Sequence, residues 1–318
     1  MDIAIFSPEE LPLVLATLTT VAAKPQGLTP LEEQFLQVVN QLHQGDVTVN
    51  HLSPIPTTKV AEIITEPHHR QRLLQMAMVM AMVDGDITPC QQKALYSLAE
   101  TLNVSEQGLR VLHTAANGHK LLARIDMTRR IMSKFMGAAY QEEGFVGIKK
   151  IVTPLIGSGE DSEVAWKYRQ LGLLPKGTLG RVYWEHCTRQ RFSFPGEAGG
   201  IPERMVFHDF GHILSGYGTD PQGEIQQGAF QAGFIRKDGF VFLLFVILQF
   251  HWGVKITPVA DAYQGLFNIP LVMHALQRGA ACKVDLSDNW NFWEVVDLPV
   301  EELRQRYGIP PFSLPSLS

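Results

Sequence analysis

The sequence has few cysteines and shows no pattern typical of a targeting segment. Its three cysteines, Cys90, Cys187 and Cys282, are far apart and form no Cys-x-x-Cys pair. Such an odd, scattered set argues against a disulfide framework and indicates reduced thiols in a cytosolic protein. The first residues show neither a basic start followed by an apolar core nor an arginine-rich, acid-poor stretch. We therefore expect no secretory signal and no mitochondrial transit peptide, and a bacterial cytoplasm fits best.

Positive charge is also scarce. The chain has 27 Lys and Arg against 32 Asp and Glu, which gives a formal net charge of −5. A general nucleic-acid binder normally carries a basic face, so this balance argues against nucleic acid as a partner. It leaves membranes open, because a local patch of the surface can still be basic.

Long apolar runs are missing. The longest, residues 240–250, is broken only by Gln249, and as a helix its eleven residues would reach about halfway across a bilayer. We expect a buried core helix here. A wall of an apolar ligand pocket and a membrane-docking surface are the alternatives.

The length of the chain suggests two domains. Its 318 residues exceed one average domain, and it has no low-complexity tract and no clear internal repeat. Residues 145–162 are rich in Gly, Ser and Pro, which is typical of a loop that connects two domains. Helical patterns prevail on both sides of it. The sequence therefore predicts an all-α protein with two helical domains, residues 1–145 and residues 160–318.

The first domain has the pattern of a small helical bundle. Thr29 and Pro30 suit the N-cap and the first position of a helix, and apolar residues then recur at helical spacing from Leu31 onward. Residues 73–83 are apolar nearly all round, which predicts the central helix of the bundle. Residues 84–86 (Asp-Gly-Asp) lack the later ligands of an EF-hand loop, so we expect a turn that ends this helix.

This layout resembles the tellurite-resistance TerB-like helical domain. The resemblance covers about residues 28–118, and the matching stretch is residues 80–88, followed by the helix of residues 95–104. The family is linked to membrane-stress and metal-related systems. From the resemblance, only Asp84 and Asp86 are noted, as weak site candidates.

A histidine pair in the second domain carries the strongest chemical signal. We expect a helix from Pro202 to Gly216, on which His208 and His212 are four residues apart and present both imidazoles on one face. That arrangement suits two nitrogen ligands on one divalent ion, although a surface pair or a core pair is the alternative. Asp209 borders the same face, as a third ligand or as an acceptor that fixes a histidine tautomer.

The next helix can bring a further carboxylate to this face. Gly216 suits a left-handed helix end, and Asp220 and Pro221 suit the N-cap and first turn of a helix that folds back antiparallel. Glu224 then lies in an early turn of that helix and can reach the histidines. We expect Gly211, which has no side chain, to leave room near the pair for a bound molecule.

The donor set and three polar residues suggest what the site could hold. The donors are nitrogen and oxygen without thiolate, so zinc, iron, manganese and cobalt all stay open. Arg204 lies one turn before His208 and could orient a substrate carboxylate, with a solvated surface charge as the alternative. Gln227 and Gln231 share the face of Glu224 and could bind a polar ring substituent or water.

The spacing of the candidate ligands resembles a known signature. The sequence His208-Asp209-x-x-His212, then eleven residues, then Glu224 is similar to the signature of the ubiquinone-biosynthesis Coq-four family. Residues 174–180 (Leu-Pro-Lys-Gly-Thr-Leu-Gly) also resemble the segment before a helix in that family.

The Coq-four resemblance covers roughly residues 160–310 and has several implications. It implies an all-helical fold in which residues matching His208, Asp209, His212 and Glu224 hold a divalent metal. It also implies an apolar cavity for a polyprenyl tail and peripheral attachment to a membrane. The implied reaction removes the ring carboxylate of a polyprenylated hydroxybenzoate, with oxidative hydroxylation at the same carbon. The TerB-like part is not found in the usual family member.

Three functions follow as hypotheses. The first is a metal-dependent enzyme of quinone biosynthesis, a polyprenyl-hydroxybenzoate decarboxylase (a lyase), with Asp209 and Glu224 as catalytic residues. The second is a non-catalytic scaffold that binds prenyl lipid in a membrane-associated biosynthetic complex. The third is a hydrolase, either a His-Glu-x-x-His-like peptidase with Asp209 in place of the glutamate, or an HD-type phosphohydrolase that would also use His186 and Asp261.

The expected partners follow from the same resemblance. They are a polyprenylated small molecule or lipid and, peripherally, the cytoplasmic membrane. Assembly with further copies of the chain or with other proteins of a biosynthetic complex stays open.

Overall fold

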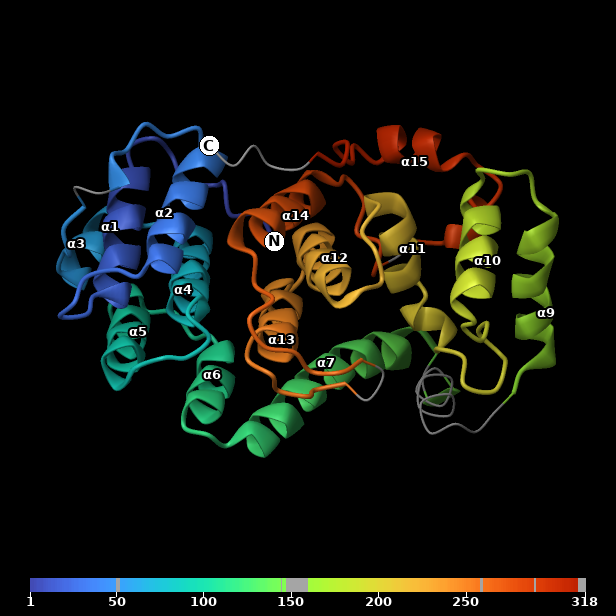
Figure 1. Ribbon diagram of the computed structural model, residues 1–318, viewed down its shortest axis with the longest axis horizontal. Coiled ribbons are helices and arrows are strands. Elements are labelled where there is room, and N and C mark those ends of the chain that lie inside the picture. Colours follow the sequence, from blue (N-terminus) through green and yellow to red (C-terminus); the bar gives the residue numbers. More distant parts are fainter. Residues whose placement is uncertain (50–51, 144, 147–159, 258–259, 289, 314–318) are drawn as a thin grey trace.

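The computed structural model describes residues 1–49, 52–143, 145–146, 160–257, 260–288 and 290–313. Within these ranges the chain forms α-helices and short 3-10 helices, together with two isolated β-bridges and no β-strand. The all-α prediction is therefore confirmed. Figure 1 shows an elongated molecule, with the first five helices at one end and the helices of residues 162–190 at the other.

Six helices form the N-terminal part: α1 (Leu11–Ala22), α2 (Pro30–Leu42), α3 (Thr57–Ile63), α4 (Pro67–Met82), α5 (Pro89–Leu102) and α6 (Gly108–Ala116). Thr29 caps α2 and Thr88 caps α5, each in a capping box with the residue three positions on. Every residue of α4 from Arg72 to Met82 is buried, as expected for the central helix of a bundle. The Asp-Gly-Asp turn of residues 84–86 follows it, as predicted.

A largely buried ion network ties the start of α2 to this turn. Lys24 Nζ lies 2.9 Å from Glu32 Oε1 and 2.6 Å from Asp84 Oδ2. Thr29 Oγ1 donates to Asp84 Oδ1 at 2.7 Å, and Gln91 Nε2 donates to Glu32 Oε1 at 3.2 Å. The Asp84 carboxylate thus shares the ammonium group of Lys24 with Glu32. In the part of the chain that the structure describes, it belongs to no cluster of three or more candidate metal ligands.

A long helix that the sequence patterns do not predict, α7 (Lys120–Glu143), lies between the two halves of the chain. It packs against α6 and α13 and runs along the lower edge of the molecule in Figure 1. Of the predicted connection at residues 145–162, residues 147–159 lie outside the described ranges. The division into two domains therefore stays a prediction.

Seven α-helices and three 3-10 helices follow in the described C-terminal residues: α9 (Ser162–Gln170), η2 (Leu171–Leu173), α10 (Leu179–Gln190), η3 (Glu203–Met205), α11 (Phe207–Ser215), α12 (Pro221–Phe234), α13 (Phe240–Phe250), α14 (Ile269–Ala281), η4 (Phe292–Glu294) and α15 (Val300–Arg306). Helix α12 lies at their centre and packs against α11, α13 and α14 (Figure 1).

Glycines set the depth of α12 in the core. A Cβ atom at Gly233 would lie 2.3 Å from Leu276 O, and a Cβ atom at Gly279 would lie 2.0 Å from Phe230 O. Both separations are far below van der Waals contact, so α12 and α14 approach this closely only because these positions carry no side chain. The backbone that carries Glu224 is thereby held in place.

Helix α13 is a core helix, as expected. All its residues except Phe245 are buried. Its single polar residue, Gln249, is satisfied: Nε2 donates to Ala260 O at 3.0 Å, and Oε1 accepts from the Ile256 amide at 3.0 Å. Among the helices that the structure describes, none combines the length and the hydropathy needed to cross a bilayer.

The end of α13 also joins the two halves of the chain. His251 Nε2 lies 3.0 Å from Val83 O, and Trp252 Nε1 donates to Met82 O at 3.1 Å. These bonds satisfy carbonyl groups that the end of α4 leaves without helical partners. The buried apolar side chains of both halves form one continuous core.

Candidate metal centre

The two helices that carry the candidate ligands form the predicted hairpin. Gly216 ends α11 in the left-handed conformation, with φ 82°. The Asp220 side chain then accepts from the backbone N–H groups of Gln222 and Gly223, and Pro221 is the first residue of α12. The turn chemistry is therefore as expected, and it places Glu224 in the first turn of α12.

The start of α11 differs from the prediction of one helix beginning at Pro202. The Met205 amide donates to Pro202 O at 2.8 Å, and the Val206 amide donates to Glu203 O at 3.1 Å. These three-residue bonds make a 3-10 turn, η3, and the α-helix begins only at Phe207. His208 and His212 remain one turn apart on α11.

Three of the four predicted ligands converge. His208 Nε2 lies 3.5 Å from one oxygen of Glu224, and His212 Nε2 lies 3.4 Å from the other. The two Nε2 atoms are 3.3 Å apart, and the rings are nearly perpendicular. The ligand atoms of all three residues lie within 4.8 Å of one another, which places them around a common point.

The partners of the other ring nitrogens determine what this point can hold. His208 Nδ1 lies 2.9 Å from Gln231 Oε1, and His212 Nδ1 lies 3.1 Å from Tyr217 O. Both partners are acceptors, so each neutral ring donates through Nδ1 and turns the lone pair of Nε2 toward the cluster. Two lone pairs and the Glu224 carboxylate then face one another without a hydrogen between them. Such a set needs a cation at its centre, either a proton or a metal ion.

Asp209, the fourth predicted ligand, is not among the residues whose ligand atoms lie within 4.8 Å of one another. It follows His208 on α11, and its charge acts on both histidines. Burial raises the pKa of Asp209, although the charges of the two histidines act in the opposite direction. Its carboxyl group is therefore a neighbour of the cluster with a raised pKa rather than one of the converging groups.

Protonation of the cluster follows from its geometry. Burial lowers the pKa of His208, but the hydrogen bond and charge of Glu224, helped by Asp209 and Gln231, outweigh this and raise the pKa to about 9. Burial raises the pKa of Glu224, but the hydrogen bonds and charges of the two histidines lower it to about 2. Without a metal, the cluster is thus an imidazolium–carboxylate pair at neutral pH. The positive charge at its centre is then the proton of His208.

The space beside Gly211 is filled by the protein, so the expectation that it leaves room for a bound molecule is wrong. A Cβ atom at Gly211 would lie 2.1 Å from Gln227 Nε2. The Gln227 side chain is fully buried, accepts from Ser215 Oγ at 2.8 Å and donates to His208 O at 3.4 Å. It fastens α12 to α11 across the glycine.

The three residues predicted to contact a substrate lie in different surroundings. The glutamines Gln227 and Gln231 already have protein partners and hold His208 in position. Arg204 lies half-buried in η3, before α11, and its contact with a substrate stays a prediction.

A cavity of about 320 Å³ opens beside His212 and was not predicted. It is lined by α10, by the end of α11 and by the loop of residues 216–219. His186 and Arg189 reach it from α10. The His186 ring is stacked on His212, with centroids 6.5 Å apart, and its Nε2 is buried without a hydrogen-bond partner among the described residues. The sequence offers a weak signal for this, since His186 and Arg189 lie three apart, a spacing that places two side chains on the same face of a helix.

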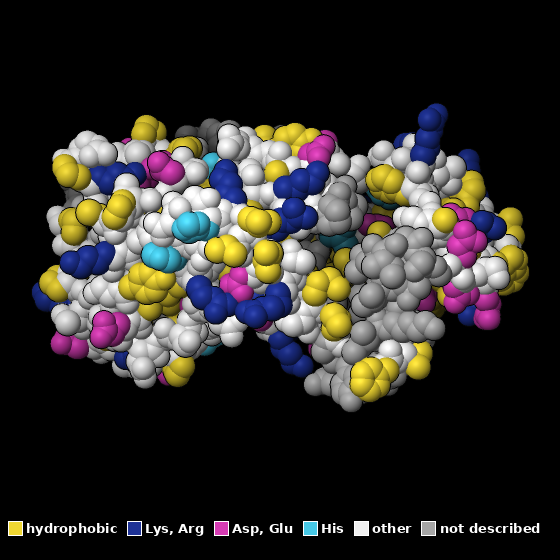
Figure 2. Space-filling model, turned by 90° about the horizontal axis from the view of Figure 1, so that it is seen from below, with side chains coloured by type: hydrophobic (Ala, Val, Ile, Leu, Met, Phe, Trp, Pro, Cys, Tyr) yellow, Lys and Arg dark blue, Asp and Glu magenta, His cyan; other side chains and the backbone are white. Residues whose placement is uncertain are grey.

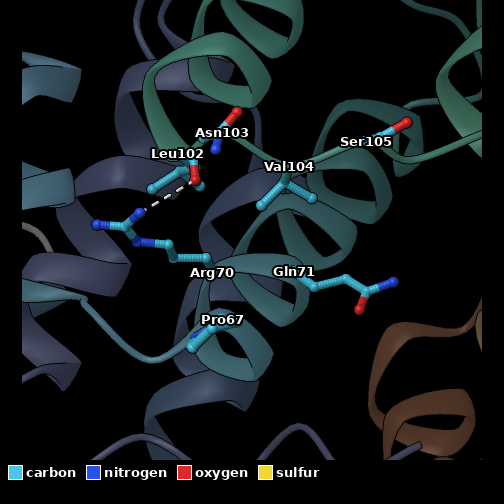
Figure 3. Close-up of a pocket in the computed structure, with 7 residues that line it drawn as sticks. All are labelled: Pro67, Arg70, Gln71, Leu102, Asn103, Val104 and Ser105. Atoms are coloured by element: carbon cyan, nitrogen blue, oxygen red, sulfur yellow. Dashed lines mark hydrogen bonds between the residues drawn. The ribbon is translucent and has the colours of Figure 1, made fainter.

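The slightly larger hollow of Figure 3, about 340 Å³, has no comparable group. It lies between α4 and the end of α5, and Arg70 is its only cationic residue. The Arg70 guanidinium is hydrogen-bonded to the backbone: it donates to the carbonyl oxygens of Ala61, Ile64 and Leu102. This residue ties the ends of α3 and α5 together.

Neither the phosphohydrolase alternative nor a cysteine nucleophile receives support from the geometry. Asp261, which an HD-type phosphohydrolase would need beside the histidines, is 76% exposed and pairs with Lys255 at 3.0 Å. Cys187, adjacent to His186, is buried, and burial raises the pKa of its thiol to about 12. A thiol of that pKa is a poor nucleophile at neutral pH.

Comparison with known proteins adds little. No family model matches the chain, and no curated protein matches it either. Among solved structures, it is similar to a protein from Nostoc punctiforme described as a candidate ubiquinone biosynthesis protein, with 16% sequence identity and a TM-score of 0.34. That match covers 78% of this chain and 100% of the other. At so low a TM-score the likeness gives no ground for assigning a fold family or an activity.

Proposed function

We propose that this chain is a metal-dependent enzyme of quinone biosynthesis that removes the ring carboxylate of a polyprenylated hydroxybenzoate. The observation that carries the metal site is the convergence of two imidazole Nε2 atoms and the Glu224 carboxylate on one point, with an acceptor at each Nδ1 atom. The choice of substrate follows the Coq-four resemblance of the His208-Asp209-x-x-His212 and Glu224 spacing.

The donor set fits a divalent ion. His208, His212 and Glu224 would hold it, and Gln231 and Tyr217 fix the imidazoles in the tautomer that binds through Nε2. Three protein ligands leave a position open for substrate, as in catalytic rather than structural metal sites. When bound, the ion would supply Lewis acidity toward a phenolate or carboxylate oxygen of the ring.

The cavity beside His212 suits the ring of such a substrate. Its volume of about 320 Å³ is at the lower end of the range for ligand pockets, and Arg189 provides a cation for an aromatic carboxylate. His186 brings a buried nitrogen that lacks a partner. A polyprenyl tail would not fit in this volume together with the ring, so the tail would lie outside.

The chain can also supply the proton that decarboxylation consumes. Loss of CO2 leaves an electron pair on the ring carbon, and one proton must replace the carboxylate there. Asp209, whose pKa is raised by burial, holds a proton near the cluster closer to neutral pH than an exposed aspartate does. Hydroxylation at the same carbon would instead require dioxygen, a redox-active ion and a two-electron reductant that converts the second oxygen atom to water.

Two measurements on the full-length protein test the proposal. Metal content is determined by mass spectrometry after loading with zinc, iron, manganese or cobalt, and CO2 release is followed from a carboxyl-labelled prenylated hydroxybenzoate. We expect one equivalent of metal and metal-dependent CO2 release, both lost in His212→Ala and in Glu224→Gln. The control His113→Ala, on the surface of α6, should keep both.

Each of the other outcomes has a distinct meaning. Stoichiometric metal in His212→Ala would refute the assignment of the ligands. Bound metal and copurified polyprenyl lipid without any CO2 release would refute the enzyme and favour the lipid-binding scaffold. Peptidase or phosphatase activity that depends on Asp209 would favour the hydrolase instead.

A further inference from the structure

Helix α7 presents apolar side chains on two opposite faces. On the inner face, Ala123 and Met127 are fully buried in the core. On the outer face, Leu121, Leu122 and Ile125 are 66%, 57% and 55% exposed. A surface helix ordinarily needs only one apolar stripe, and three neighbouring large aliphatic side chains in water indicate a surface that another phase or molecule covers.

The exposed apolar group is surrounded by positive charge. Lys120, Arg124 and Arg129 are exposed on α7, and Arg110 reaches the same region from α6. Asp126, the acidic residue on this part of α7, is paired with Arg110 at 2.6 Å and with Arg129 at 3.0 Å. The local net charge is positive although the whole chain carries −5. Figure 2 views the face on which α7 lies and shows Lys and Arg side chains gathered beside hydrophobic ones.

We infer that α7 docks the protein on a lipid bilayer that contains anionic headgroups. The helix would lie in the plane of the interface, with Leu121, Leu122 and Ile125 in the acyl boundary and Arg124 and Arg129 at the phosphates. This surface lies outside the residues of the proposed metal site and does not depend on what that site does.

Charge selects this occupant over the two other candidates. A second copy of the chain, docked face to face, would bring a second positively charged surface against this one, and like charges in an interface are repulsive. An acidic peptide would satisfy the arginines but would need a groove for its apolar anchors, whereas the exposed leucines stand on the convex side of a helix. An anionic bilayer offers both negative charge and an apolar interior.

Vesicle co-sedimentation of the full-length protein tests the inference. The vesicles are made of phosphatidylcholine alone or of phosphatidylcholine with phosphatidylglycerol. We expect binding to the anionic vesicles, weakened by added salt, and little binding to the neutral ones. Arg124→Glu combined with Arg129→Glu should weaken binding by at least roughly 30-fold, at about 1 kcal/mol for each basic residue and 1.4 kcal/mol for each tenfold.

Matched variants separate docking from net charge. Lys59→Glu combined with Lys93→Glu changes the net charge by the same amount on exposed positions of α3 and α5, and should leave at least a third of the affinity. Replacing Leu121, Leu122 and Ile125 together by Ser should weaken binding at least roughly tenfold, because apolar burial is lost. The control Ile63→Ser removes a side chain that is 56% exposed on α3 and should have no effect.

The inference fails on any of three results. The first is absence of binding of the wild type to anionic vesicles. The second is equal weakening by the α7 variants and their controls, provided that thermal unfolding shows all of them to be folded. The third is a wild-type dimer in light scattering that becomes a monomer when Leu121, Leu122 and Ile125 are replaced, because the face would then belong to a second copy of the chain.

Discussion

Glu224→Gln in the metal-free protein is the sharpest test of the cluster's electrostatics. Among the described residues, this carboxylate is the only anion in direct contact with the two facing imidazoles. Its pKa falls from an ordinary 4.5 to about 2, and at about 1.4 kcal/mol per pKa unit this corresponds to about 3 kcal/mol of stabilisation at pH values where His208 is charged. The raised pKa of His208 reports the same interaction and is not added to it. We expect Glu224→Gln to lower the free energy of unfolding by this amount, because a glutamine carries no charge.

The stability that the Glu224–His208 interaction contributes should decrease both at low pH and at high pH. The depressed pKa of Glu224 means that its contribution is complete above about pH 4.5 and is lost as the pH falls toward 2. The raised pKa of His208 means that its contribution is complete below about pH 6.5 and is lost as the pH rises through about 9. The difference in stability between wild type and Glu224→Gln should therefore be largest between about pH 4.5 and pH 6.5.

Urea unfolding with a chelator present, at pH 5.5, 7.5 and 9.5, measures this difference. The control is Glu301→Gln, which removes a carboxylate that is 76% exposed and pairs with Arg304; we expect it to change stability by less than about 0.5 kcal/mol at every pH. If the free energy of unfolding of Glu224→Gln is lower than that of wild type by the same amount at all three pH values, the carboxylate does not face an imidazolium. A difference under about 0.5 kcal/mol at pH 5.5 would lead to the same conclusion.

Two further predictions concern the same hairpin and the helix behind it. Zn²⁺ affinity, measured by calorimetry, should fall by about tenfold for each pH unit below 9, because the ion must displace the proton of His208; a flat profile would contradict the protonation of this ring. Gly279→Ala should lower the free energy of unfolding by at least about 2 kcal/mol in urea, because its methyl group would stand 2.0 Å from a backbone oxygen of α12; unchanged stability would show that α12 and α14 do not cross this closely.

Local chemistry made the hairpin predictable from the sequence. Gly216 must take a left-handed conformation that suits glycine, and Asp220 followed by Pro221 marks a helix start with a side-chain cap. With the turn fixed on both sides, the spacing of His208, His212 and Glu224 follows. Helix α4 was predictable for a similar reason, since a stretch that is apolar all round can only be central.

The surroundings of the cluster depend on packing between distant residues and could not be read from local patterns. Gly211 looked like free space, but a side chain of α12, Gln227, fills it. His186 and Arg189 lie more than twenty residues before His212, and only the packing of α10 against α11 brings them to the same cavity. Helix α7 escaped prediction because apolar residues on both faces break the single stripe by which amphipathic helices are recognised.

The size of the cavity links the two proposals. A polyprenyl tail transferred from a bilayer into protein gains little, since both surroundings are apolar, whereas a tail left in water loses about 0.8 kcal/mol for every CH2 group. A cavity of about 320 Å³ with His186 and Arg189 in its lining has room for the ring of the proposed substrate and not for its tail. The side chains of α13, the most apolar of the described helices, are buried in the core. A protein that docks through α7 needs no pocket as long as the tail. It can leave the hydrocarbon in the lipid and recognise only the carboxylated ring.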